Sequence, residues 1–158
     1  MRVGFGFDSH PLAEGRALVL GGVPVPFESG LSGHSDGDVL THAIMDALLG
    51  AASLGDKGPH FPSSDEQYRN ISSLILLSRT GDLVRNSKWQ VVNVDATMLA
   101  QRPLLAPYMD SMKLNISSAL SIPQSDVSIK ATTTDYLGFV GRGEGMAAFA
   151  VALVEGKA

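Results

Sequence analysis

The sequence predicts an α+β fold: a two-layer sandwich in which helices cover one face of a mixed four-stranded sheet, with an N-terminal hairpin added. Two observations favour this fold. Segments with the alternation of β-strands are interspersed with segments whose apolar residues recur at helical spacing. The length of 158 residues is also typical of one domain, so we expect residues 1–158 to form a single domain.

The first predicted element is a strand at residues 1–10, MRVGFGFDSH. Its apolar residues alternate, so Val3, Phe5 and Phe7 share one side of the strand. The strand then ends in a carboxylate and an imidazole that are two residues apart, which places both on one face.

A hairpin and a helix follow. Residues 17–27, ALVLGGVPVPF, are predicted to form a hairpin that turns at Gly21 and Gly22. Residues 28–37 read as a polar loop, and residues 36–53 carry apolar side chains at the spacing of a helix.

The rest of the chain continues with helices and strands. Helices are predicted at about 69–87 and 105–121, and strands at 89–100 and 127–134. The segment 145–156, GMAAFAVALVEG, has the alanine content of a helix but the valines and glycine boundaries of a buried strand, and we predict a strand.

Composition narrows the class of protein. The chain contains 12 Lys+Arg and 16 Asp+Glu residues, which gives a net charge of −4. It has no cluster of basic residues, which argues against nucleic-acid binding. The absence of cysteine excludes disulfides and thiolate metal sites. No apolar run reaches the length of a membrane span. We therefore expect no membrane association and a cytoplasmic location, or a plastid-type organelle if a transit peptide has been removed.

Asp8, His10 and His42 form the first candidate site. Two imidazoles and one carboxylate are typical of a catalytic zinc site with one open position. Asp38 and Asp46 lie four residues on either side of His42, and either is expected to orient its ring. The pattern alone also fits a surface Asp–His pair and a helix histidine packed against the sheet, which is the simpler interpretation.

Two glycine-rich stretches are candidate phosphate contacts. In GHSDGD, residues 33–38, Ser35 or Asp36 is expected to cap the following helix, whose N-terminus and neighbouring histidine suit a phosphate. KATTTD at 130–135, followed by GFVGRGEG at 138–145, could line a ligand pocket. Neither contains a dinucleotide fingerprint or a Walker motif.

Together these stretches resemble a known family. The motifs DSH at 8–10, HSDGDVLTHA at 34–43, FPSSD at 61–65, NVDAT at 93–97 and ATTTDYLGFVGRGEG at 131–145 are similar to those of 2-C-methyl-D-erythritol 2,4-cyclodiphosphate synthases, enzymes of the non-mevalonate isoprenoid pathway. The resemblance runs in order over essentially the whole chain.

The resemblance implies a phosphorus–oxygen lyase reaction. The 2-phosphate of 4-diphosphocytidyl-2-C-methyl-D-erythritol 2-phosphate attacks the β-phosphorus of the same molecule, which closes the cyclodiphosphate and releases CMP. The nucleophile is already an anion, so the reaction needs a folded substrate and charge neutralisation rather than a strong base.

The resemblance also implies the site residues. Zinc is held by Asp8, His10 and His42, so the apolar first strand is expected to belong to the core and to deliver two ligands at its end. A Mg2+ or Mn2+ ion on the diphosphate uses Asp135. Substrate contacts are implied for His34, Ser35, Asp56, Gly58, Ala100, Leu104, Leu105, Ala106, Ala131, Thr132, Thr133, Thr134, Phe139 and Arg142. His34 and Thr133 are expected to position the transition state.

Family members are homotrimers whose active sites lie between neighbouring subunits. By resemblance, Arg142, Glu144, Phe7 and Phe139 lie near the three-fold axis, where some members hold an isoprenoid diphosphate.

Three positions depart from the family pattern: Asp135 replaces a glutamate, Leu104 a lysine and Ser63 an aspartate. None is an implied zinc ligand, but the missing lysine is expected to weaken diphosphate binding. Two rival functions remain at this point: a zinc-dependent phosphodiesterase or pyrophosphatase, and a non-enzymatic trimer that binds isoprenoid diphosphates.

Overall fold

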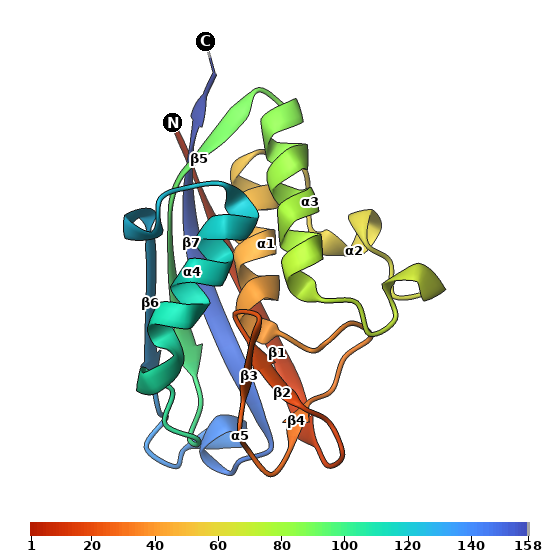
Figure 1. The fold of residues 1–158 in the computed structure, drawn as a ribbon, viewed down its shortest axis with the longest axis vertical. Coiled ribbons are helices and arrows are strands. Elements are labelled where there is room, and N and C mark those ends of the chain that lie inside the picture. The colour runs from red at the N-terminus through yellow and green to blue at the C-terminus, as the bar shows by residue number, and fades with distance from the viewer. Residues whose placement is uncertain (158) are drawn as a thin grey trace.

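The computed structural model describes residues 1–157 and shows two layers, with three longer helices packed on one face of a twisted sheet (Figure 1). This is the predicted α+β sandwich. The helices that form the second layer are α1 (Val39–Ala51), α3 (Ser73–Asn86) and α4 (Met109–Leu120).

The sheet is mixed and has five strands in the order β4-β1-β7-β5-β6. Within residues 1–157, only β5 and β6 pair in parallel. The prediction of four strands is one short, because β4 contains only two residues and leaves no alternation to detect. The strands are β1 (Arg2–Ala13), β4 (Gly30–Leu31), β5 (Trp89–Leu99), β6 (Val127–Thr132) and β7 (Gly145–Gly156).

The predicted N-terminal hairpin is confirmed. Strands β2 (Leu18–Leu20) and β3 (Val23–Val25) pair as a separate two-stranded sheet. Gly21 and Gly22 form its turn with φ values of 56° and 69°. A two-residue hairpin loop with positive φ at both positions favours glycine, which has no Cβ to clash.

Short helical turns complete the chain. Their bounds are α2 (Lys57–His60), η1 (Glu66–Tyr68), η2 (Ala106–Tyr108), η3 (Gln124–Asp126) and α5 (Gly138–Gly141). The long helices begin later than predicted, since the residues before them form capping loops or 3-10 turns. None of the helices in the described part of the chain has the length and apolar character needed to cross a lipid bilayer.

Strand β1 presents its faces differently from our expectation. Val3, Phe5 and Phe7 point away from the helices and remain 68%, 62% and 46% exposed, so the assignment of these side chains to the core is wrong. The face that packs on α1 carries Gly4 and Gly6 instead. A Cβ at either position would clash with the backbone of α1, so the two glycines allow the helix to lie directly on the strand.

The hydrophobic core fills the space between the sheet and the helices. Its fully buried side chains come from every layer: Leu40, Ile44 and Leu48 from α1, Leu77 from α3, Met98 from β5 and Ile116 from α4. Strand β7 contributes small buried residues, mostly alanines, to the same face, which lets α1 cross the middle of the sheet closely.

Candidate metal centre

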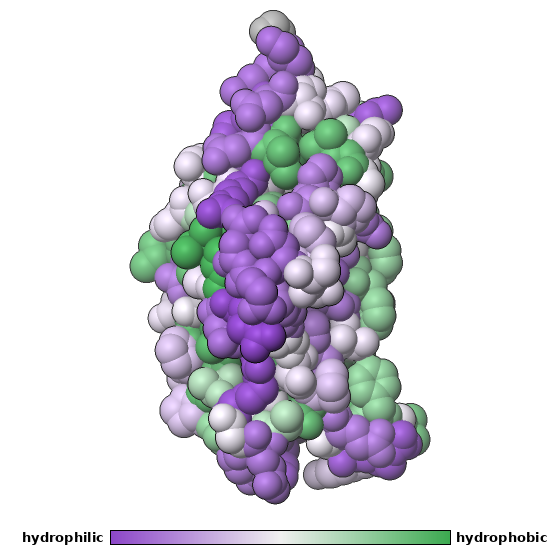
Figure 2. All heavy atoms as spheres, turned by 90° about the vertical axis from the view of Figure 1, so that its right-hand side faces the viewer, coloured by the Kyte–Doolittle hydropathy of each residue, from purple (hydrophilic) through white to green (hydrophobic). Residues whose placement is uncertain are grey.

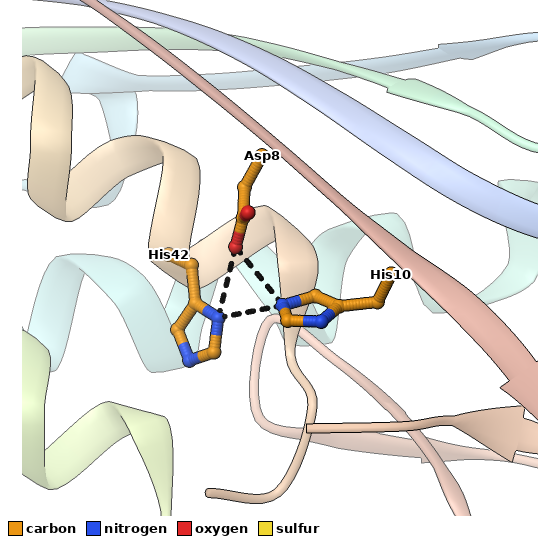
Figure 3. Close-up of side chains that lie close together, drawn as sticks. All are labelled: Asp8, His10 and His42. Atoms are coloured by element: carbon orange, nitrogen blue, oxygen red, sulfur yellow. Dashed lines mark hydrogen bonds and ion pairs between the residues drawn. The ribbon is translucent and has the colours of Figure 1, made fainter. Parts of the chain in front are cut away.

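Asp8, His10 and His42 converge where β1 passes α1 (Figure 3). His10 Nε2 lies 3.0 Å from Asp8 Oδ2, and His42 Nδ1 lies 3.1 Å from the same oxygen. The two imidazole nitrogens are 3.1 Å apart. The close packing of α1 on the glycine face of β1 brings the helix histidine to the strand residues. The predicted grouping of these three side chains is therefore confirmed.

The spacing of the three atoms suits a metal ion. Donor atoms around a small tetrahedral ion lie about 3.3 Å apart, given bond lengths of roughly 2.0–2.1 Å. The three atoms thus form one face of such a coordination shell without rearrangement. The side chains of Asp8 and His10 are 17% and 18% exposed, so a fourth ligand can enter from solvent.

Asp8 is ionised in this setting. Burial raises the pKa of Asp8, but hydrogen bonds from His10 and His42 and the positive charge of Lys57 outweigh it. The net effect holds the pKa of the carboxyl well below its usual range. A carboxyl group has to be deprotonated to bind a metal, and the site keeps Asp8 in that form before any ion binds.

Two serines hold the far side of the His42 ring. His42 Nε2 lies 2.9 Å from Ser73 Oγ and 3.0 Å from Ser35 Oγ. Ser73 Oγ donates its hydrogen to Asp36 Oδ1 at 2.5 Å, so its lone pairs face the histidine. The ring then donates from Nε2 and leaves an unprotonated Nδ1 aimed at Asp8 and His10. Asp36 and Ser73 were not predicted to act on His42, since they are 37 residues apart and share no motif.

The expectation that Asp38 or Asp46 orients His42 is wrong. The Asp38 carboxylate accepts hydrogen bonds from the backbone of Gly21 and Gly22 and from Thr41. It caps α1, in place of the predicted Ser35 or Asp36, and ties the hairpin to the helix. Burial, together with the charge of Asp36, raises the pKa of Asp38.

Asp46 instead binds Lys57. Its two oxygens accept from the Lys57 backbone N–H and from Nζ, each at 2.8 Å. Lys57 was not predicted to belong to the site, because a lone lysine in a loop carries no signal until its neighbours in space are known.

A cavity of about 270 Å³ opens over the metal cluster. His34, Ser35 and Gly58, all implied substrate contacts, line it together with the triad, as does Ser63. Asp56 lies beside it at the start of α2, with its Oδ1 next to Gly58. On the side of the molecule that carries α2 and α3, a hydrophilic band runs down the middle and hydrophobic patches flank it (Figure 2).

The implied nucleotide residues line a second cavity of about 410 Å³, at the ends of β5 and β6. Its lining includes Ala100, Leu104, Leu105, Ala131, Thr132 and Thr133. The implied contact Ala106 follows this group as the first residue of η2. This cavity shares no lining residue with the metal cavity, so the structure does not bring the two groups of predicted residues together within one chain.

The other predicted residues lie in the loop after β6 and around α5. Asp135 has a φ of 51° and lies outside the Asp8–His10–His42 cluster. Thr134 and Phe139 line a small apolar cavity with Phe7. Arg142 is exposed and forms an ion pair with Glu144 at 2.8 Å.

Comparison with protein families finds a match over residues 1–155 to the model described as the YgbB family. The chain is 58% identical to the 2-C-methyl-D-erythritol 2,4-cyclodiphosphate synthase of Pelotomaculum thermopropionicum, over 98% of this chain and 95% of that protein.

Solved structures agree. The complex of IspF from Plasmodium falciparum with CDP superimposes with a TM-score of 0.86 at 32% identity, over 99% of this chain and 97% of that one. The bifunctional IspDF of Campylobacter jejuni gives a TM-score of 0.94 at 41% identity, where 98% of this chain spans 42% of that one.

Proposed function

The chain belongs to the YgbB family of 2-C-methyl-D-erythritol 2,4-cyclodiphosphate synthases, and from this premise we propose how its residues support the cyclisation. The reaction closes 4-diphosphocytidyl-2-C-methyl-D-erythritol 2-phosphate on itself and releases CMP, as a lyase step of isoprenoid biosynthesis. The observation that carries the proposal is the convergence of Asp8, His10 and His42 at a cavity of about 270 Å³.

We propose zinc as the ion at this cluster. Two imidazole nitrogens, one carboxylate oxygen and a donor spacing of 3.0–3.1 Å fit zinc with one position open to the cavity. When bound, the ion would supply charge that neutralises the reacting phosphates.

The protein residues position the metal ligands and the substrate and do not act as an acid or a base. Ser35 and Ser73 hold His42 in one tautomer, and the cavity walls keep the flexible substrate folded. His34 is itself fixed, because its Nε2 lies 3.0 Å from the Asp65 carbonyl oxygen. An intramolecular attack held in its reactive geometry recovers roughly 7–11 kcal/mol of the barrier.

We further propose that the second cavity binds the cytidine and diphosphate and that Asp135 ligates Mg2+ or Mn2+ there. Thr132 and Thr133, whose side chains carry hydroxyl groups, line it. A cavity of about 410 Å³ is of the size that binds small ligands. Related structures contain CDP, which is consistent with a nucleotide pocket in this fold.

A homotrimer is the assembly that we propose. The metal cavity involves β1, near one edge of the sheet, and the nucleotide cavity involves β6, at the other edge. One substrate can reach both only if two copies place opposite edges together. The outward sheet face is also apolar, since Phe5, Phe149 and Val151 are 62%, 37% and 41% exposed.

Isoprenoid diphosphate binding near the three-fold axis is part of this proposal. Phe7 and Phe139 line an apolar cavity, and Arg142 carries the nearby positive charge. Arg142→Ala should abolish a co-purifying isoprenoid diphosphate while leaving bound zinc in place. Mass spectrometry that finds the same ligand on the variant would contradict this assignment.

The product of the reaction tests the proposed function. The purified protein with zinc and magnesium should convert the substrate to cyclodiphosphate and CMP, and His42→Ala should lose both zinc and turnover while keeping a cooperative melt. Formation of a hydrolysed monophosphate instead would indicate a phosphodiesterase. A His42→Ala variant with full zinc and normal turnover would refute the metal assignment.

Light scattering tests the assembly. The wild-type protein should have the mass of three chains. Phe5→Asp should reduce it to one, whereas Ile75→Asp should not, since Ile75 is 47% exposed on α3, on the helical side of the sheet. A monomeric wild-type protein with full activity would exclude the shared site.

A further inference from the structure

Lys57 is the only lysine or arginine that lines the metal cavity within the described chain. Its Nζ lies 2.8 Å from Asp46 Oδ2 and 3.7 Å from Asp8 Oδ2. The ammonium group therefore lies beside the metal cluster, in the wall of the metal cavity.

Asp46 fixes this lysine from both ends. One carboxylate oxygen accepts the Lys57 backbone N–H, and the other accepts from Nζ. Asp46 lies on α1 four residues after His42, on the same face of the helix. The position of the ammonium relative to the metal ligands is thus set by one rigid helix and not by the loop before α2.

We propose that Lys57 binds the substrate phosphate that occupies the open position of the metal, with Asp46 as its positioning residue. The inference rests on the proposed function and adds to it a residue that no motif indicates. An ammonium has three donors, of which Asp46 uses one. Once Asp8 is engaged by a metal, the 3.7 Å contact with Asp8 is weakened and the remaining donors are available to an anion.

The charges of the cavity support this role. Asp8 and Lys57 cancel, so a divalent ion leaves the lining with two positive charges, which balance one phosphate dianion. Asp46 pairs with the lysine from behind and does not line the cavity. Without Lys57, the metal would be the only cationic group in this subunit's cavity that could bind the phosphate.

A purely structural role makes a different prediction. If Lys57 only ties α2 to α1, its removal lowers thermal stability and leaves anion binding unchanged. Zinc affinity without an anion serves as the control for an intact metal site, because removing a positive charge beside a cation site should not weaken binding of the cation.

The test uses inorganic pyrophosphate as the probe and isothermal titration calorimetry on the zinc-loaded protein. Lys57→Met keeps the length of the side chain and removes its charge, Lys57→Arg keeps the charge, and Lys113→Met removes an equal charge on α4, outside the cavity. Lys57→Met should weaken pyrophosphate binding at least about tenfold, the loss expected for a charge-assisted contact. Lys57→Arg should retain most of the affinity and Lys113→Met all of it.

Zinc affinity, measured by chelator competition without pyrophosphate, should be unchanged or higher in Lys57→Met. A smaller loss of pyrophosphate affinity in Lys57→Met, or an equal loss in Lys113→Met, would overturn the inference while wild-type turnover upholds the proposed function. A wild-type protein that neither binds zinc nor forms the cyclodiphosphate would overturn both.

Discussion

Replacing Ser73 with alanine should weaken zinc binding about fivefold, and replacing Ser35 as well should weaken it about a hundredfold. The N–H at His42 Nε2 has two acceptors, Ser73 Oγ at 2.9 Å and Ser35 Oγ at 3.0 Å. The single variant loses one hydrogen bond, worth about 1 kcal/mol, and keeps the other. The double variant leaves a buried N–H without a protein acceptor and no longer favours the tautomer with a free Nδ1, for a total of about 2.7 kcal/mol.

The assay is zinc affinity by competition with a chromogenic chelator, because Ser35 also lines the substrate cavity and would confound turnover. Ser118→Ala is the matched control, since Ser118 is exposed on α4. Circular dichroism confirms that each variant is folded. A double variant that binds zinc as tightly as the wild-type protein would refute the argument that these hydroxyls set the histidine tautomer.

Three further predictions concern charge. Asp8 has a pKa below its unfolded value, so its contribution to stability is present above about pH 4 and is lost as the pH falls further; in metal-free melts, the stability of the wild-type protein relative to Asp8→Asn should therefore decline below pH 4, and a constant difference would contradict this. Leu104 lines the proposed nucleotide cavity and is 77% exposed, so Leu104→Lys should add a surface-type attraction to the diphosphate of about 1 kcal/mol and lower the substrate KM. Steady-state kinetics that show an unchanged KM would mean that residue 104 does not contact the diphosphate. Asp135→Asn keeps a residue suited to the φ of 51° and removes its charge, so it should raise the magnesium concentration for half-maximal rate without altering zinc content, whereas superimposable magnesium titrations would remove Asp135 from the metal site.

The three candidate ligands could be singled out because each has a local signal, and the resemblance to a known family then implied that they bind a metal. Asp8 and His10 share a strand face by their spacing of two, and His42 lies on a helix with clear apolar periodicity. The residues that orient the cluster have no such signal. The spacing of Asp38 and Asp46 about His42 correctly predicted a helical neighbourhood. Their contacts, however, include residues distant in sequence: Asp38 accepts hydrogen bonds from two backbone amides of the hairpin, and Asp46 accepts them from Lys57.

The orientation of β1 was missed for a related reason. Alternation shows that Phe5 and Phe7 share a face but not which face meets the helices. Large apolar residues usually face the core of a single chain, and the exception is explained if the outer face of the sheet meets other chains. The glycines between them were the better guide, since glycine repeated at every second position indicates a close approach by another backbone.

Strand β1 therefore has a length that matters as much as its composition. Its even-numbered positions, Gly4, Gly6, Asp8 and His10, serve the helix and the metal, and its odd-numbered positions serve the outer face. Deleting one codon between Val3 and Phe7 would exchange the roles of all residues before the deletion and drive side chains into the backbone of α1. A deep mutational scan of this segment should accordingly tolerate exchanges of one apolar residue for another on the outer face but no single-codon insertion or deletion.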